Sequence, residues 1–125
     1  MELRSIDHVQ VAGPPGCEAA ARTFYGDLLG LREIPKPPRL ASRGGVWFRL
    51  GTQELHVGIE QDFRPALKAH PAFNCVDPDA LAQALEASGA PVTWDGEVSG
   101  LRRFYTSDPF GNRLEIVGVP LSSAF

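Results

Sequence analysis

Hydrophobic and polar residues alternate in several short stretches of the chain, a pattern typical of β-strands with two different faces. The predicted strands span residues 5–12, 31–34, 46–50, 53–60, 69–76, 91–94, 102–107 and 112–119. Apolar residues three and four positions apart predict amphipathic helices over residues 17–29 and 77–89. The Pro-Lys-Pro-Pro sequence at residues 35–38 predicts an extended, irregular connector. The order is therefore strand, helix and three strands, repeated once, which indicates an α+β fold.

This order reflects an internal repeat, and the repeat relates all three histidines of the chain to one another. Aligning the first strands of the halves places His8 on His70, an offset of 70 − 8 = 62. Aligning the last strands places His56 on Glu115, an offset of 115 − 56 = 59. A change in loop length accounts for the difference between the offsets. The four residues thus form two equivalent pairs, each on the less apolar face of its strand.

These paired positions favour a metal site. Glu115 alone, between Leu114 and Ile116, would be interpreted as a carboxylate facing solvent from a half-exposed sheet. A single histidine in a strand is likewise usually structural. Imidazole and carboxylate are, however, ligands that divalent first-row metals prefer, and four of them from four strands of a curved sheet can converge. We therefore predict a metal ion held by His8, His56, His70 and Glu115.

Composition narrows the class of protein. The 125 residues predict one domain, and the formal net charge of −3 offers no basic stripe for nucleic acid. No apolar run approaches the roughly 20 residues that span a membrane, and the N-terminus shows no signal peptide pattern. Two cysteines without motif spacing predict reduced thiols and a cytoplasmic protein.

Several segments together resemble the vicinal oxygen chelate superfamily, which includes glyoxalases, bleomycin resistance proteins and dioxygenases. The matching segments are IDHVQVA from Ile6, FYGDLLGL from Phe24, ELHVG from Glu54, HPAFNCVD from His70 and RRFYTSDPFGNRLEIV from Arg102. The resemblance implies two βαβββ modules that form curved half-barrel sheets, at about residues 3–62 and 67–120 of a single domain, 1–125. It also implies ligands on the first and last strands of each module, the places of the four predicted ligands. A homodimer that shares the site between modules of two chains is implied, with a closed monomer as the alternative.

The same resemblance implies a metal-dependent enzyme, most simply a glyoxalase-like lyase or isomerase. Its divalent ion (Ni, Zn, Fe or Mn) would bind a small oxygen-chelating substrate and stabilise an enediolate-type intermediate, with Glu115 as the catalytic base. The chain departs from the glyoxalase pattern at His56, where a carboxylate is usual. The first alternative is an extradiol-type dioxygenase with iron bound by two histidines and Glu115. The second is a non-catalytic small-molecule binding protein of the bleomycin-resistance type.

Other polar and aromatic residues on the predicted strands could surround such a site. The predicted substrate-binding residues are Trp47, Arg49, Arg103 and Tyr105. Gln10 and Asn74 share the strand faces of the histidines and are predicted to hydrogen-bond the ligand side chains. Because Arg102 and Arg103 are adjacent in a strand, only one of them can face the site.

Overall fold

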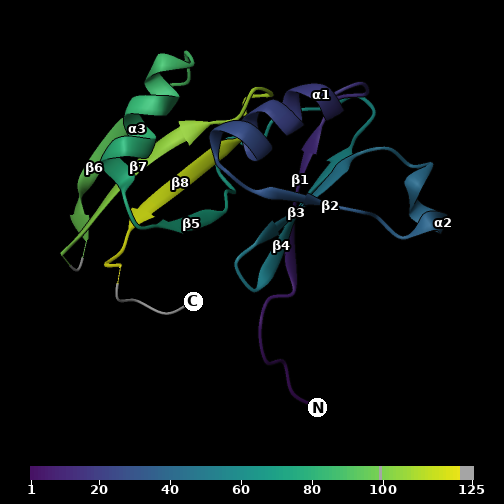
Figure 1. Cartoon of the computed structure of the whole chain (residues 1–125), viewed down its shortest axis with the longest axis horizontal. Helices are drawn as coiled ribbons and strands as arrows, with labels where there is room; N and C mark the ends of the chain where they lie inside the picture. The colour runs from purple at the N-terminus through teal and green to yellow at the C-terminus, as the bar shows by residue number, and fades with distance from the viewer. Residues whose placement is uncertain (99, 122–125) are drawn as a thin grey trace. The chain divides into compact units, whose positions relative to one another are not determined.

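The computed structural model describes residues 1–98 and 100–121, which fall into two compact units, Met1–Phe63 and Arg64–Phe125 (Figure 1). Elements of the first unit are β1 (His8–Gly13), α1 (Glu18–Ala21), η1 (Arg22–Leu28), β2 (Arg32–Ile34), α2 (Pro38–Ala41), β3 (Val46–Leu50) and β4 (Gln53–Ile59). Elements of the second are β5 (Ala72–Cys75), α3 (Pro78–Ala87), β6 (Thr93–Val98), β7 (Leu101–Ser107) and β8 (Arg113–Gly118). No described helix is long and apolar enough to cross a membrane.

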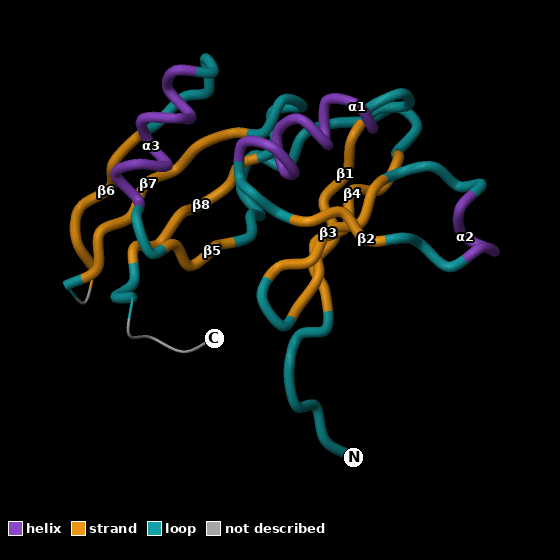
Figure 2. Tube along the Cα trace, in the orientation of Figure 1, coloured by secondary structure: helices purple, strands orange, loops and turns teal. Residues whose placement is uncertain are grey.

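Each unit contains one four-stranded mixed sheet, with strand orders β1-β4-β3-β2 and β5-β8-β7-β6 (Figure 2). The first and last strands of each unit pair in parallel, and the other neighbours pair antiparallel. The helix after the first strand supplies the connection that a parallel pair requires. This arrangement confirms the predicted α+β fold of two βαβββ modules; neither sheet is closed into a barrel.

In the first unit, one face of the sheet is apolar because alternate strand residues point the same way. The side chains of Phe48, Leu55 and Val57 are fully buried on that face, and Tyr25 from η1 is buried with them. The opposite face carries His8, Gln10, Trp47, Arg49, Glu54 and His56. Packing under the helix thus leaves the polar face of the sheet for a site.

In the second unit, Leu85 of α3 is buried together with Phe104, Leu114 and Ile116 of the sheet. The helix begins as predicted, since the Asp77 side chain accepts a hydrogen bond from the Ala80 N–H (3.1 Å). Pro follows at the first helical position, where its missing N–H costs nothing. The polar strand face on the other side carries Glu115.

The turn before β8 fixes where that strand starts. Asp108 is buried, and its Oδ1 accepts hydrogen bonds from the backbone N–H groups of Phe110 and Asn112, both at 2.9 Å. Asn112 in turn accepts from the Ala66 N–H through its Oδ1 (3.0 Å). A Gly111 φ of +92° completes the turn. These bonds set the register of β8 and hence the place of Glu115 on its face.

Several predicted boundaries differ from the structure: β1 begins at His8 rather than at residue 5, and β6 continues past residue 94. Three other differences have a clear physical reason. The proline-rich connector contains a short helix, because Pro38 occupies the first position of α2, where proline is tolerated. The helix predicted over residues 17–29 widens into the π-helical η1, which lets the neighbours Phe24 and Tyr25 both be buried. The strand predicted over residues 69–76 is only β5, so His70 lies just before it rather than within it.

Candidate metal centre

The four predicted ligands have matching spacings in the two units, although His70 lies two residues before β5 and the other three lie within strands. In the first unit His56 pairs with Gln10, which follows His8 by 10 − 8 = 2 positions. In the second unit Glu115 pairs with Ala72, which follows His70 by 72 − 70 = 2 positions. The repeat seen in the sequence is thus also a repeat of strand pairing. Each unit brings two of the four predicted ligands together.

His70 and Glu115 form a close pair in the second unit. His70 Nε2 lies 2.9 Å from Glu115 Oε1, and His70 Nδ1 lies 2.9 Å from the carbonyl oxygen of Lys68. A carbonyl oxygen only accepts hydrogen bonds, so Nδ1 is the donor to Lys68, and Nε2, which faces the Glu115 carboxylate, is the nitrogen that a metal would bind in place of a proton. Neighbouring ligand atoms on an ion with bonds of about 2.1 Å are roughly 3 Å apart, close to the observed spacing. This pair therefore fits two adjacent positions on one ion.

Arg103 of β7 holds the other oxygen of Glu115. Its Nη1 donates to Glu115 Oε2 (3.4 Å) and its Nη2 donates to Asp95 Oδ2 (2.9 Å). Glu115 is 8% exposed, so the guanidinium balances a buried carboxylate. Arg103 was predicted to bind substrate; here its two nitrogens are used by Glu115 and by Asp95 of β6, a carboxylate that the sequence interpretation missed.

His56 is enclosed by aromatic rings in the first unit. The Trp47 ring stacks on one face with centroids 3.8 Å apart and an interplanar angle of 3°. The His8 ring stacks on His56 at 4.2 Å and 17°. Nitrogen lone pairs lie in the ring plane, so nearly parallel rings do not direct their lone pairs at one point. In this arrangement His8 and His56 cannot both bind one ion; the chemical types fit, but the ring orientation does not.

His8 is the member of this stack that can turn. Its side chain is 44% exposed, it begins β1, and its Nδ1 contacts only the neighbouring Asp7 Oδ2 (2.9 Å). His56, by contrast, is 4% exposed and its Nε2 lies 2.9 Å from Glu54 Oε1. His8 is thus the ring of the stack that is least held by its surroundings, and its rotation would uncover one face of the His56 ring. The donor set therefore fits a metal once His8 rotates.

Glu54 is the second carboxylate that the sequence interpretation did not single out. It lies two positions before His56 and hence on the same strand face, which was the signal available in the sequence. Its Oε2 lies 3.7 Å from Arg49 Nη2, so Arg49, predicted to bind substrate, is drawn to a carboxylate here. This chain has His56 where the glyoxalase pattern has a carboxylate. The Glu54 carboxylate lies two residues earlier, on the same face of the strand.

The remaining predicted residues lie on the expected faces with different neighbours. Tyr105 contacts His70 edge to face at 5.5 Å, and the Arg113 guanidinium lies 4.0 Å from the Tyr105 ring centroid. Gln10 lines a cavity in the first unit and makes no hydrogen bond to a histidine within the described residues. Asn74 is exposed on β5, also without such a bond there.

No group of three or more His, Cys, Asp or Glu side chains forms a metal-binding cluster among the residues that the structure describes. The predicted ligands therefore lie as two separate pairs, His70 with Glu115 and His8 with His56. Whether they serve one ion stays a prediction.

Comparison with known proteins identifies the family. A family model described as Glyoxalase/Bleomycin resistance protein/Dioxygenase superfamily matches residues 5–116. The solved structure of a glyoxalase family protein from Bacillus anthracis is 51% identical, with a TM-score of 0.89 over 94% of this chain and 97% of that one. No curated protein matches this chain.

More distant solved structures share the fold. Lactoylglutathione lyase from Agrobacterium tumefaciens is 24% identical with a TM-score of 0.72, over 99% of this chain and 100% of that one. The fosfomycin resistance protein FosX from Listeria monocytogenes is 15% identical with a TM-score of 0.75, over 96% and 97%. The family suggested by the sequence is thus confirmed, and the chain belongs to the Glyoxalase/Bleomycin resistance protein/Dioxygenase superfamily.

Proposed function

We propose that this protein is a metal-dependent enzyme, a glyoxalase-like lyase or isomerase that acts on a small oxygen-chelating substrate. The observation that carries the proposal is the His70–Glu115 pair, with Nε2 and Oε1 2.9 Å apart and His70 Nδ1 tied to a backbone carbonyl. A histidine fixed in this way presents one nitrogen, and a buried carboxylate beside it supplies negative charge. Both features are typical of a preformed metal half-site.

His8, His56, His70 and Glu115 are the residues that would hold the ion, a divalent Ni, Zn, Fe or Mn. When bound, such an ion supplies Lewis-acid polarisation of substrate oxygens. The stacked rings of the first unit make His8 the ligand that must turn and His56 the more constrained one. We also propose a homodimer in which two chains share each site. The proposed location is the cytoplasm.

Glu115 is the proposed catalytic base. A carboxylate held near a substrate carbonyl can take a proton from the neighbouring carbon and return it to the next one. Arg103 keeps one oxygen of Glu115 hydrogen-bonded, while Oε1 faces His70. Arg103 is thus a positioning residue that fixes the orientation of the base.

Metal analysis of purified wild-type, Glu115→Gln and His56→Ala proteins tests this proposal. We expect about one divalent ion per chain in the wild type and an affinity at least about 100-fold weaker in Glu115→Gln, since a ligand is lost. Glu60→Gln is the control, because Glu60 is an exposed carboxylate next to β4. If the wild-type protein contained none of Ni, Zn, Mn and Fe, and its thermal stability did not change when they were added, the enzyme proposal would be refuted. A non-catalytic binding protein would then be favoured.

Activity measurements separate the two kinds of enzyme. The lyase proposal predicts turnover of a hemithioacetal by the Ni- or Zn-loaded protein and its loss in Glu115→Gln. Oxygen consumption with catechol by the Fe-loaded protein, without hemithioacetal turnover, would replace the lyase with the dioxygenase.

A further inference from the structure

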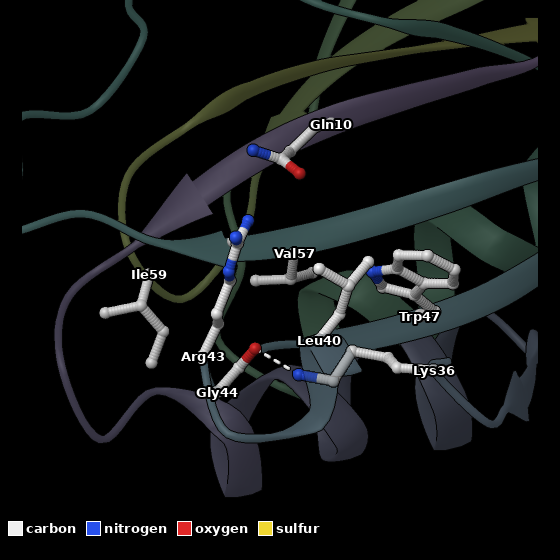
Figure 3. A pocket seen from close by; sticks show the side chains of 9 residues that line it. Gln10, Lys36, Leu40, Arg43, Gly44, Trp47, Val57 and Ile59 are labelled. Atoms are coloured by element: carbon white, nitrogen blue, oxygen red, sulfur yellow. Dashed lines mark hydrogen bonds between the residues drawn. The ribbon is translucent and has the colours of Figure 1, made fainter. Parts of the chain in front are cut away.

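A cavity of about 220 Å³ lies within the first unit, on the polar face of its sheet (Figure 3). The segment that connects β2 to β3, residues 35–45, forms one side, and β1, β3 and β4 form the other. Side chains that define its character are Gln10, Lys36, Leu40, Arg43 and Trp47. None of these was needed to explain the candidate metal centre except Trp47.

Both charged side chains that line the cavity are basic. Figure 3 shows the Arg43 guanidinium extending across the cavity toward Gln10, while the Lys36 ammonium donates to the Gly44 carbonyl oxygen. Arg43 has no ion-pair partner among the residues that the structure describes. Glu18 interacts with Lys36 electrostatically, but its Oε2 already accepts from the Gly45 N–H (3.0 Å). A cavity with uncompensated positive charge attracts an anion.

The remaining wall is flat and apolar. Trp47 contributes its indole ring and Leu40 contributes an aliphatic side chain. The Trp47 ring also stacks on His56, with ring centroids 3.8 Å apart. A ligand against Trp47 would therefore lie next to the candidate metal ligands of the first unit. Small-molecule sites commonly combine apolar walls with a few placed polar groups in this way.

Two glycines keep the cavity open. A Cβ atom on Gly58 would lie 2.8 Å from Gln10 Nε2, so glycine there gives the Gln10 amide room to lie across β4. Gly45 has a φ of +88°, and a Cβ on it would overlap the carbonyl oxygen of Val57. The loop that carries Arg43 can approach β4 only because no side chain intervenes. The two glycines thus let the loop and the Gln10 amide lie close to β4.

We propose that this cavity binds the carboxylate end of a small organic acid with a flat, apolar body. Arg43 presents a planar fork suited to a carboxylate, Lys36 and Gln10 add hydrogen-bond donors, and Trp47 covers the flat body. The assignment rests on the proposed function in one respect: the same molecule would present its chelating oxygens to the metal. Recognition of the carboxylate itself needs no metal.

Benzoate and its uncharged counterpart benzamide test the proposal on the metal-free protein. The chain has two tryptophans, so a Trp94→Phe background leaves Trp47 as the only tryptophan reporter. We expect benzoate to change Trp47 fluorescence saturably, and benzamide to bind at least about 10-fold more weakly, since it lacks the charge that Arg43 recognises. Equal affinity for the two compounds, or no saturable response to benzoate, would overturn the proposal.

Charge-matched variants separate a specific site from general attraction. Arg43→Gln should weaken benzoate binding about 10-fold and leave benzamide unchanged. Arg39→Gln removes the same charge from the same connection between β2 and β3, but Arg39 does not line the cavity and should leave both affinities unchanged. Equal losses from the two substitutions would refute the site. Gly58→Ala should weaken the binding of both compounds. Circular dichroism checks that each variant is folded.

This experiment is independent of the metal test. Benzoate binding in a protein that binds no metal would leave the carboxylate site standing and remove the enzyme proposal. Metal binding by a protein that does not discriminate between benzoate and benzamide would leave the enzyme proposal standing and remove the carboxylate site.

Discussion

Arg102 and Arg103 are neighbours on β7, yet their surroundings differ because successive strand residues face opposite ways. Arg102 pairs with Asp79 on the outside of the second unit, where both side chains are about half exposed, and it covers the Trp94 ring. Arg103 faces the polar side of the sheet and joins Glu115 to Asp95. The same residue type is thus a surface group at one position and the partner of a buried carboxylate at the next.

We therefore expect Arg103→Met to lower the free energy of unfolding of the metal-free protein by about 1–2 kcal/mol, because the buried Glu115 carboxylate loses its partly exposed cation. Arg102→Met is the matched control and should cost no more than about 0.5 kcal/mol, since an exposed ion pair contributes little. Urea denaturation of both variants measures the difference. Equal costs would mean that Arg103 does not stabilise Glu115.

The segment between β2 and β3 is the element that the sequence pattern described least well. Its path depends on two glycines with positive φ, Gly44 at +74° and Gly45 at +88°. A hydrogen bond from the Gly45 N–H to the Glu18 side chain ties it to α1. Hydrophobic periodicity carries no information about such a segment, because its conformation comes from glycine geometry and a single side-chain acceptor.

Comparing two glycines with nearly the same φ distinguishes the energetic cost of backbone strain from the cost of a steric clash. Gly89 has a φ of +90°, and a Cβ added to it would meet nothing within 4 Å, whereas a Cβ on Gly45 would overlap the Val57 carbonyl oxygen. We expect Gly89→Ala to cost about 1–2 kcal/mol from the left-handed conformation alone. Gly45→Ala should cost at least about 2 kcal/mol more because β4 must also move. Chemical denaturation checks both values, and equal costs would contradict the close approach.

Glu18 makes the stability of this segment depend on pH. The hydrogen bond from the Gly45 N–H is the largest cause that lowers the pKa of Glu18 below 4.5. The folded pKa is below the unfolded one, so the contribution is present above about pH 4.5 and is lost as the pH falls through the folded value. The stability difference between wild type and Glu18→Gln should therefore shrink on acidification. A difference that stays constant in urea titrations down to about pH 3 would contradict this.

At the scale of the whole molecule, the repeat was the most informative sequence feature. Strict alternation placed Leu55 and Val57 under a helix and His56 on the opposite face, and the repeat related His56 to Glu115. Side-chain orientation could not be obtained in this way. The stack of Trp47, His56 and His8 depends on ring packing across three strands, and alternation does not specify rotamers.

The two basic cavity residues, Lys36 and Arg43, were missed for a related reason. Lys36 and Arg43 come from the proline- and glycine-rich segment, whose sequence gives no face to which a charge can be assigned. Asp95 was missed because β6 begins at Thr93 and continues beyond the predicted strand end at residue 94. In each case tertiary contact, rather than local pattern, decides which side chains meet.

The last prediction concerns how the half-sites of two units serve one ion. If a homodimer joins the first unit of one chain to the second unit of its partner, a His8→Ala chain and a Glu115→Gln chain have complementary defects. In a mixed dimer one site contains both changes and the other contains neither. After unfolding and refolding of an equimolar mixture, half of the dimers are mixed and each has one intact site of two. Random pairing therefore restores about a quarter of the metal sites and of the activity, although each variant alone has none. A closed monomer predicts no recovery at any mixing ratio, so metal content and mass in solution, measured on the same refolded sample, distinguish the two arrangements.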